Sequence, residues 1–432
     1  MSLDIREGLT VGPLLLLHIE RSKVEVVWTS GQKLYLQSGL GTPWGPAGGA
    51  GGGGWGEGCL GFPTWDAAPV TRISGGRQRR SLLLGLLEFH WWFTFSVCLH
   101  RYVLVPRGQS PGVSVGHTCT FLSTGEKGKG NILIVGGANP NGSFTGCQVL
   151  SLDRHEWDIP EWDGLLARYE HCSFVPESSR NTLWVFAGAE QSGNLNCLQV
   201  LHVADGSSWE TVKVSGVPPS PRTYHTSSAC VGDRLFVFSG GHAGASPVAD
   251  SQLHVFDTVS STWSQPDTEG TAPSSRHGHV VVAVGSTIYI HGGLSGDKFH
   301  SDMFSIDTDT MKWKQVQATG DVPPGLAAHD ATALGKNIYI FGGMTPESAT
   351  NSMYKFDTEE QKWTLIKFEG DLPPNRLDHS MCIVPWQMRK EGSGHGDLAH
   401  TPCSEVVNLC FIFGGMDTGG VIFNDCLVTV VS

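Results

Sequence analysis

The sequence predicts an all-β fold, a six-bladed β-propeller closed by an N-terminal outer strand and preceded by a poorly ordered N-terminal extension. Three features indicate it: a histidine that recurs at a near-constant period, a glycine pair that follows most copies, and a tryptophan further along. The period is 54 residues over the first three intervals and 50 over the last two. The histidines are His117, His171, His225, His279, His329 and His379. Self-similarity at a fixed period of this size is typical of repeat architectures.

Each copy has the same order of features. An apolar run follows the histidine and ends in a glycine pair, where a sharp turn between crowded blades needs positive φ and no side chain. The pairs are Gly136-Gly137, Gly240-Gly241, Gly292-Gly293, Gly342-Gly343 and Gly414-Gly415, with Ala187-Gly188 in the second copy. A tryptophan at 157, 209, 263, 313 or 363 is expected to fill the wedge between neighbouring blades. This pattern resembles kelch repeats, which implies four short strands in each unit.

The spacing also predicts how the ring closes. The sixth copy reaches Ser432 before its outer strand, while Arg101-Tyr102-Val103-Leu104-Val105 stands at the distance before His117 that an outer strand would occupy. We therefore expect residues Tyr102 to Val105 to complete the sixth blade beside the Cys426–Val430 segment. Such closure removes two exposed strand edges.

The division into domains follows from the repeat. Residues 101–432 form the predicted propeller, and residues 1–100 carry no copy of the repeat. The glycine-rich stretch from Gly41 to Gly61 predicts a low-complexity extension with little regular structure before about Leu82. The apolar run from Leu82 to Leu99 follows three arginines and has a second interpretation as a membrane anchor, although Glu88 and His90 near its centre argue against it.

Two further features concern the sixth repeat and the cysteines. An insertion over 387–405 stretches the distance from the histidine to the glycine pair from 13 residues to 35, and we expect a surface loop there. The 11 cysteines contain no Cys-x-x-Cys pair and fall mostly in apolar runs, which indicates free buried thiols in a reducing compartment.

The charge is concentrated in the repeats. Residues 1–100 hold 8 Lys/Arg and 7 Asp/Glu, so residues 101–432 hold 29 − 8 = 21 against 41 − 7 = 34, a net charge near −13. This surface disfavours nucleic acid and direct membrane binding.

The sequence indicates protein binding and no catalysis. It lacks the motifs of nucleophilic hydrolases, phosphate-binding loops and zinc proteases, so we expect no enzyme activity, no cofactor and no metal. The repeated histidines are interpreted as bonding the backbone of their own blades, and a ring of metal ligands is the alternative. The candidate partner-binding residues lie just before the histidines, where the repeat leaves positions variable or places an arginine. They are Tyr169, Glu170, Tyr224, His277, Asp378, Arg168, Arg222, Arg276 and Arg376. For the four arginines, anchoring of the turn is the alternative role.

A more specific resemblance covers about three-quarters of the chain, from Tyr102 to Ser432. The stretches Val135 to Asn141, Arg168 to His171, Gly193 to Leu201, and Arg376 to Cys382 with Pro385-Trp386 are similar to kelch-repeat effectors of late-endosomal Rab GTPases. This resemblance implies a cytoplasmic protein that binds a GTP-bound Rab. It implies peripheral association with endosomes and the trans-Golgi network, and a role in transport between them, with other trafficking proteins as further partners. The alternative is a kelch substrate-recognition subunit of a cullin-based ubiquitin ligase, which would need an N-terminal BTB domain for which residues 1–100 are too short and too rich in glycine.

Overall fold

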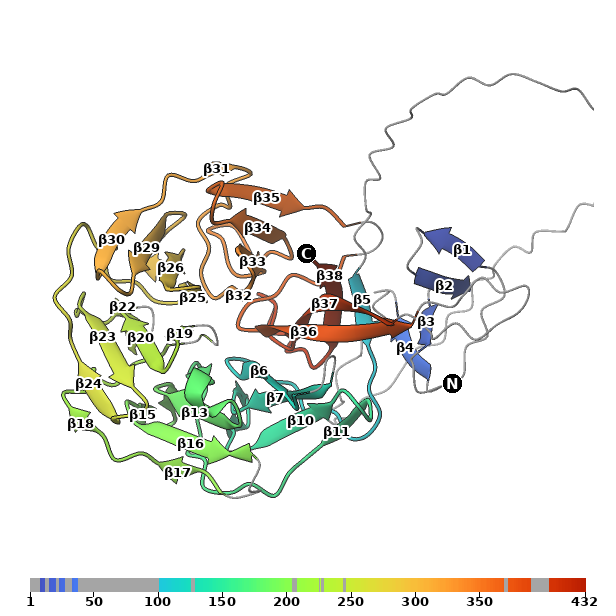
Figure 1. Cartoon of the computed structure of the whole chain (residues 1–432), viewed down its shortest axis with the longest axis horizontal. Helices are drawn as coiled ribbons and strands as arrows, with labels where there is room; N and C mark the ends of the chain where they lie inside the picture. Colours follow the sequence, from blue (N-terminus) through green and yellow to red (C-terminus); the bar gives the residue numbers. More distant parts are fainter. Residues whose placement is uncertain are drawn as a thin grey trace, which may run out of the picture. The chain divides into compact units, whose positions relative to one another are not determined.

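The computed structural model describes residues 8–11, 15–20, 23–27, 33–37, 101–125, 129–203, 208–224, 226, 229–243, 246–368, 372–389 and 404–432. In the part from residue 101 onward, mostly antiparallel sheets follow one another around a ring (Figure 1). Six sheets of four or more strands make six blades, which confirms the predicted six-bladed propeller. No helix within the described ranges is long and apolar enough to cross a membrane.

The first three blades follow the repeat from its first to its third histidine. Blade 1 has β6 (Thr118–Ser123), β7 (Gly130–Val135), β10 (Cys147–Ser151) and β11 (Glu156–Asp158). Blade 2 has β12 (Cys172–Phe174), β13 (Thr182–Phe186), β16 (Leu198–His202) and β17 (Glu210–Thr211), with a 3₁₀ turn at Glu177–Ser179. Blade 3 has β19 (Cys230–Val231), β20 (Arg234–Phe238), β23 (Leu253–Asp257) and β24 (Thr262–Ser264), extended by β18 (Ser215–Gly216).

The last three blades follow in the same way. Blade 4 has β25 (Val280–Val284), β26 (Thr287–His291), β29 (Met303–Asp307) and β30 (Lys312–Gln315). Blade 5 has β32 (Asp330–Leu334), β33 (Asn337–Phe341), β34 (Met353–Asp357) and β35 (Lys362–Ile366), extended by β31 (Thr319–Gly320). Blade 6 has β36 (Ser380–Arg389), β37 (Ser404–Phe413), β38 (Cys426–Val431) and β5 (Arg101–Leu104).

Short hairpins follow the glycine pairs in four blades. They are β8 (Ala138–Asn139) with β9 (Gly142–Ser143), β14 (Ala189–Glu190) with β15 (Gly193–Asn194), β21 (Gly241–Ala243) with β22 (Ser246–Pro247), and β27 (Leu294–Ser295) with β28 (Lys298–Phe299).

The predicted closure of the ring is confirmed. Strand β5 pairs antiparallel with β38 in a register that places Leu104 opposite Cys426 and Val103 opposite Leu427. The sixth blade therefore joins residues from the two ends of the propeller sequence. Leu104 is buried, in a cluster that also includes residues of β36, β37 and β38.

The sheet of blade 6 continues beyond the predicted outermost strand. Strand β4 (Lys33–Gln37) pairs with β5, and β3 (Lys23–Val27), β2 (Leu15–Glu20) and β1 (Gly8–Val11) follow it in antiparallel order. The sequence predicted little regular structure before about Leu82, and these four strands within residues 8–37 depart from that prediction. The run from Leu82 to Leu99 lies outside the described residues, and the division at residue 100 stays a prediction.

The insertion in the sixth repeat differs from a simple surface loop. Strands β36 and β37 are ten residues each, and their pairing runs out to Arg389 opposite Ser404. The two ends of the insertion at 387–405 therefore extend a hairpin, and residues 390–403 lie outside the described residues.

The tryptophans fill the wedges between blades, as predicted. Each packs on the second strand of the preceding blade, with ring centroids 5.8 Å apart for Trp157 and Phe413 and 5.0 Å apart for Trp263 and Phe186. Contacts of this geometry add to the area that aromatic side chains bury. Within the described ranges eight cysteines are present, all of them free, and six are buried.

One glycine pair is placed differently from the sequence interpretation. In blade 3 the turn at the end of β20 uses Ser239 and Gly240, both at positive φ, and Gly241 is the first residue of the next hairpin. Serine is tolerated because its hydroxyl donates to the Arg276 carbonyl at 2.9 Å.

The closure gives a test by truncation. Removing residues 1–98 keeps β5 paired, so the midpoint of thermal unfolding should change little. Removing residues 1–107 exposes the edge of β38 and the pocket left by Leu104, and should lower that midpoint by several degrees. Scanning calorimetry of both variants checks this. Equal midpoints would show that β5 does not stabilise the ring.

Candidate partner-binding site

The links between blades and the loops after the glycine turns meet at one mouth of the propeller. In each blade the residue two positions before the repeated histidine forms an isolated bridge with the residue that follows the glycine turn. The pairs are Val115 with Ala138, Tyr169 with Ala189, Thr223 with Gly241, His277 with Leu294, Ala327 with Met344, and Leu377 with Met416. Both kinds of segment therefore open on the same face.

Next to these bridges, the residues directly before the histidines form a ring. We call Gly116, Glu170, Tyr224, Gly278, Ala328 and Asp378 the ring residues. Backbone amides donate to the ring residue of a neighbouring blade, from Glu170 to Gly116 at 2.6 Å, from Tyr224 to Glu170 at 2.7 Å, from Ala328 to Gly278 at 2.8 Å, from Asp378 to Ala328 at 3.0 Å, and from Gly116 to Asp378 at 2.9 Å. The last bond joins the sixth blade to the first. Glu170, Ala328 and Asp378 hold positive φ at 50°, 56° and 52°, an uncommon conformation for residues other than glycine.

The repeated histidines hold each blade to the one before it. The Nε2 atoms of His117 and His279 donate to the carbonyls of Phe413 and Phe238, at 3.1 and 3.0 Å, in the preceding blade. The interpretation that each histidine bonds its own blade is therefore wrong. Burial lowers the pKa of His279 to about 3, so its imidazole is neutral at physiological pH. His225 lies outside the described residues.

The same arrangement explains the first glycine of the turn. A Cβ on Gly342 would lie 2.7 Å from Cε1 of His379 in the next blade and 2.6 Å from the Arg376 carbonyl oxygen. Its φ of +64° adds the second reason for glycine. The described residues contain no group of three or more His, Cys, Asp or Glu side chains that could hold a metal ion.

The four candidate arginines are buried and bonded within their own blades. Their exposed fractions are 0 to 1%, and each donates to the carbonyl of the first residue of its glycine turn. The acceptors are Ala187 for Arg168, Ser239 for Arg222, Gly292 for Arg276 and Gly414 for Arg376, at 2.9 to 3.0 Å. Three also meet a carboxylate, and Arg376 does so with both terminal nitrogens, at 2.7 and 3.0 Å from Asp425. This geometry supports turn anchoring and leaves no guanidinium surface for a partner.

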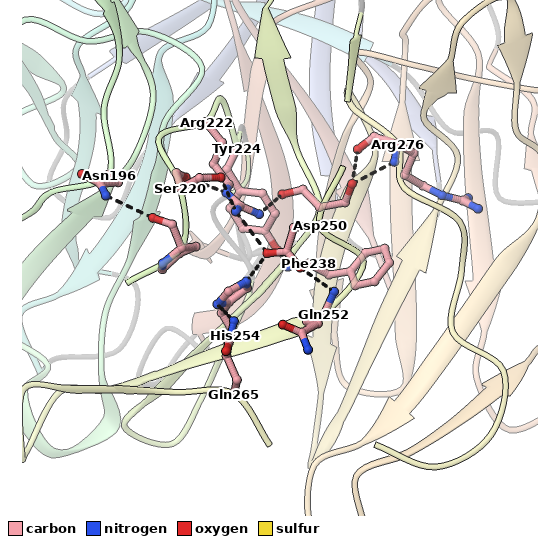
Figure 2. Close-up of polar contacts among 12 residues, drawn as sticks. Asn196, Ser220, Arg222, Tyr224, Phe238, Asp250, Gln252, His254, Gln265 and Arg276 are labelled. Carbon is pink, nitrogen blue, oxygen red and sulfur yellow. Dashed lines mark hydrogen bonds and ion pairs between the residues drawn. The ribbon is translucent and has the colours of Figure 1, made fainter. Parts of the chain in front are cut away.

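Blade 3 shows how one candidate tyrosine is used (Figure 2). Tyr224 is 3% exposed, and its hydroxyl donates to the Phe236 carbonyl at 3.0 Å. The expectation that Tyr224 is an exposed interface anchor is therefore wrong. The residue at this position differs from one repeat to the next, but the side chain of Tyr224 enters the core between blades.

The same view shows a polar network around Asp250 (Figure 2). Its carboxylate accepts hydrogen bonds from the Gln252 amide at 2.9 Å and from His254 Nε2 at 2.5 Å, and lies 3.5 Å from Arg222 Nη2. Burial opposes ionisation of Asp250, but these hydrogen bonds outweigh it and lower the pKa of the carboxyl. The network fixes the Arg222 anchor.

The remaining candidates surround a cavity at the axis, which we call the axial cavity. It has a volume of about 320 Å³. It is lined by Tyr169, Glu170, Ala189, Asn194, Thr223, Tyr224, Gly240, Gly241, His242, His277, Gly278, His279, Ala328, His329, Met344, Leu377 and Asp378. Five of the nine candidate residues, all of those other than the arginines, thus come together from four blades.

The axial cavity is acidic. Burial, with a further contribution from the nearby Glu170 carboxylate, raises the pKa of Asp378 to about 8. Burial also raises the pKa of Glu170, against a hydrogen bond from Thr223 that lowers it. One carboxyl of this pair therefore keeps its proton at neutral pH.

The anchoring role of the arginines gives a prediction. Replacing Arg376 with alanine leaves Asp425 without its bidentate partner and should lower the free energy of unfolding by about 3–5 kcal/mol. The matched control is Arg154→Ala, which removes an ion pair to Asp158 whose side chains are 58% and 55% exposed. That change should cost less than about 1 kcal/mol. Urea unfolding of both variants checks the difference, and equal losses would contradict it.

Comparison with known proteins gives a consistent result. Residues 116–343 match the KLHDC2/KLHL20/DRC7 Kelch-repeats domain, and residues 326–367 match the Kelch motif. The chain is similar to the Rab9 effector protein with kelch motifs of Danio rerio, 67% identical over 77% of this chain and 95% of the relative. The proteins of the same name from Xenopus laevis and Homo sapiens are 59% and 56% identical, each over 76% of this chain and 95% of the relative. These matches indicate no catalytic family.

Proposed function

The chain belongs to the family of Rab9 effector proteins with kelch motifs, and we propose that it binds the GTP-bound form of Rab9 through the mouth that contains the axial cavity. The observation that carries the choice of face is the convergence of Tyr169, Glu170, His277 and Asp378 on one cavity. Main-chain bonds of the ring hold Glu170 and Asp378, and bridges to Ala189 and Leu294 hold Tyr169 and His277. The side chains at these four positions are therefore not what joins the blades, which leaves the positions open to selection for recognition.

Tyr169 is the best interface anchor among them. It is partly exposed, in contrast to Tyr224, and its backbone is fixed by the bridge to Ala189. Burial raises the pKa of its hydroxyl, so the group stays a hydrogen-bond donor at physiological pH. A rigid, partly exposed tyrosine beside a cavity is a common hot spot of protein interfaces.

A second hollow extends the same face. It has a volume of about 630 Å³ and shares Asn194 and His242 with the axial cavity. The side chain of Asn194 holds this junction by donating to the Gly241 carbonyl at 3.3 Å. The two hollows together offer a continuous surface across blades 2 and 3.

The wider role follows from the family and from the charge. We infer a binding protein that is not an enzyme and that reaches late endosomes through its Rab partner, in transport to the trans-Golgi network. The net charge near −13 over residues 101–432 is unfavourable for direct contact with an anionic membrane. A protein partner on the membrane would supply the attachment.

Nucleotide preference tests this proposal. Unmodified protein should bind Rab9 loaded with a non-hydrolysable GTP analogue at least tenfold more tightly than Rab9 loaded with GDP, measured by titration calorimetry. Equal affinity for both forms would contradict an effector function.

The choice of face has its own test. Tyr169→Ala should weaken binding of GTP-loaded Rab9 by about tenfold, since a truncated interface anchor costs 1–2 kcal/mol or more, with little change in the unfolding midpoint. Tyr224→Phe removes only a buried hydroxyl. It should lower the unfolding midpoint and leave the affinity for GTP-loaded Rab9 unchanged. Unaltered affinity of Tyr169→Ala would place the interface elsewhere.

A further inference from the structure

The ring residues leave an asymmetric set of side chains at the axis. Three of them, Gly116, Gly278 and Ala328, contribute little or no side chain, and Tyr224 is buried in the core. The other two ring residues are Glu170 and Asp378, and both line the axial cavity. The ring therefore places two acidic side chains at the mouth and no basic one.

The two carboxyls come from the blades on either side of blade 1. The Glu170 amide donates to the Gly116 carbonyl, and the Gly116 amide donates to the Asp378 carbonyl. A Cβ on Gly116 would lie 3.2 Å from Cγ of Glu170, so the space above this glycine is taken by the glutamate side chain. Glycine in blade 1 thus lets the two acidic residues approach each other.

No lysine or arginine among the residues that the structure describes compensates the pair within the cavity. None of the residues that line it is lysine or arginine. The four repeated arginines are buried and bonded to carbonyls and carboxylates of their own blades.

A third acceptor lines the same cavity. His279 is 6% exposed, and burial keeps its ring neutral. Because Nε2 donates to the Phe238 carbonyl, the single ring proton is on Nε2 and Nδ1 is an acceptor. Nδ1 has no hydrogen-bond partner within the described part of the chain, and a buried acceptor without a donor is costly.

We propose that the axial cavity receives a lysine or arginine side chain of the protein partner, which Glu170 and Asp378 bind as a charge-assisted hydrogen-bonded pair. This inference rests on the proposed function, since the side chain belongs to the bound Rab. The ionised carboxylates of Glu170 and Asp378 can only accept hydrogen bonds, and a cationic side chain supplies the N–H donors. A metal ion fits less well, because no group of three ligands is present in the described ranges.

Binding of such a cation is linked to a proton. At neutral pH the carboxyl pair retains one proton, which a bound cation displaces, so affinity rises as pH rises through about 8. The other titratable groups that line the cavity are Tyr169, Tyr224, His242, His277, His279 and His329. Burial lowers the pKa of His279 and His329, and it raises that of both tyrosines. These four groups therefore do not titrate near pH 8.

The test compares Asp378→Asn with a matched control. Asparagine adopts positive φ readily and is nearly the shape of aspartate, so the ring is preserved. Glu210→Gln removes one negative charge from exposed positions of β17, outside the cavity. Binding of Rab9 loaded with a GTP analogue is measured by calorimetry at pH 6.5 and 8.5, with the unfolding midpoint of each variant as a check on folding.

The expected results separate this inference from the proposed function. Affinity of unmodified protein and of Glu210→Gln should rise about tenfold between the two pH values, as displacement of one proton allows. Asp378→Asn should bind about tenfold more weakly at pH 8.5 and lose most of the pH dependence, and Glu170→Gln should behave similarly. A complex that forms with unchanged affinity and pH dependence in Asp378→Asn overturns the cation site and leaves the effector function intact. If unmodified protein binds no Rab9, the effector function fails and the cation site falls with it.

Discussion

Six sheets can share one axis only if their inner ends approach far more closely than ordinary side chains permit. In this protein the approach is made by backbone, through the amide-to-carbonyl bonds that connect ring residues such as Gly116, Glu170 and Asp378. The histidine after each ring residue then lies against the glycine turn of the preceding blade, as His379 does on Gly342. The bond from Gly116 to Asp378 and the bond from His117 to the Phe413 carbonyl join the first blade to the last, and the pairing of β5 with β38 completes the last blade. Packing of the tryptophans further out depends on this spacing.

The candidate site is a consequence of the same constraint. Because the ring is held by main-chain atoms, the side chains of its members are not needed to join the blades, and they differ from one blade to the next. The arginines two positions further back are in the opposite situation. Arg276, for instance, bonds the Gly292 carbonyl and approaches Asp302 at 2.6 Å, so its whole guanidinium is used inside the blade. The arginines stabilise the blades and the ring residues are left for recognition, although the two sets are close neighbours in the sequence.

Much of the fold was predictable because its determinants are local and repeated. The histidine, glycine and tryptophan positions gave the number of blades, and their spacing identified residues near Tyr102 as the closing strand. Three features could not be predicted from the repeat. The partner of each histidine lies in another blade, which no period reveals. Tyr224 and Tyr169 occupy neighbouring positions in equivalent links. Tyr224 is nevertheless buried, with its hydroxyl donating to the Phe236 carbonyl. Strands β1 to β4 carry no copy of the repeat and extend a sheet whose edge was expected to end at β5.

We propose that the mouth formed by the ring residues is the surface that binds the Rab partner. Hydrogen–deuterium exchange of this protein, alone and with Rab9 loaded with a GTP analogue, can locate that surface. Amides near Ala189 to Asn194 and His242, on the loops that surround the ring, should exchange more slowly in the complex. Protection confined to outer strands such as β17 and β30, with those loops unchanged, would contradict it.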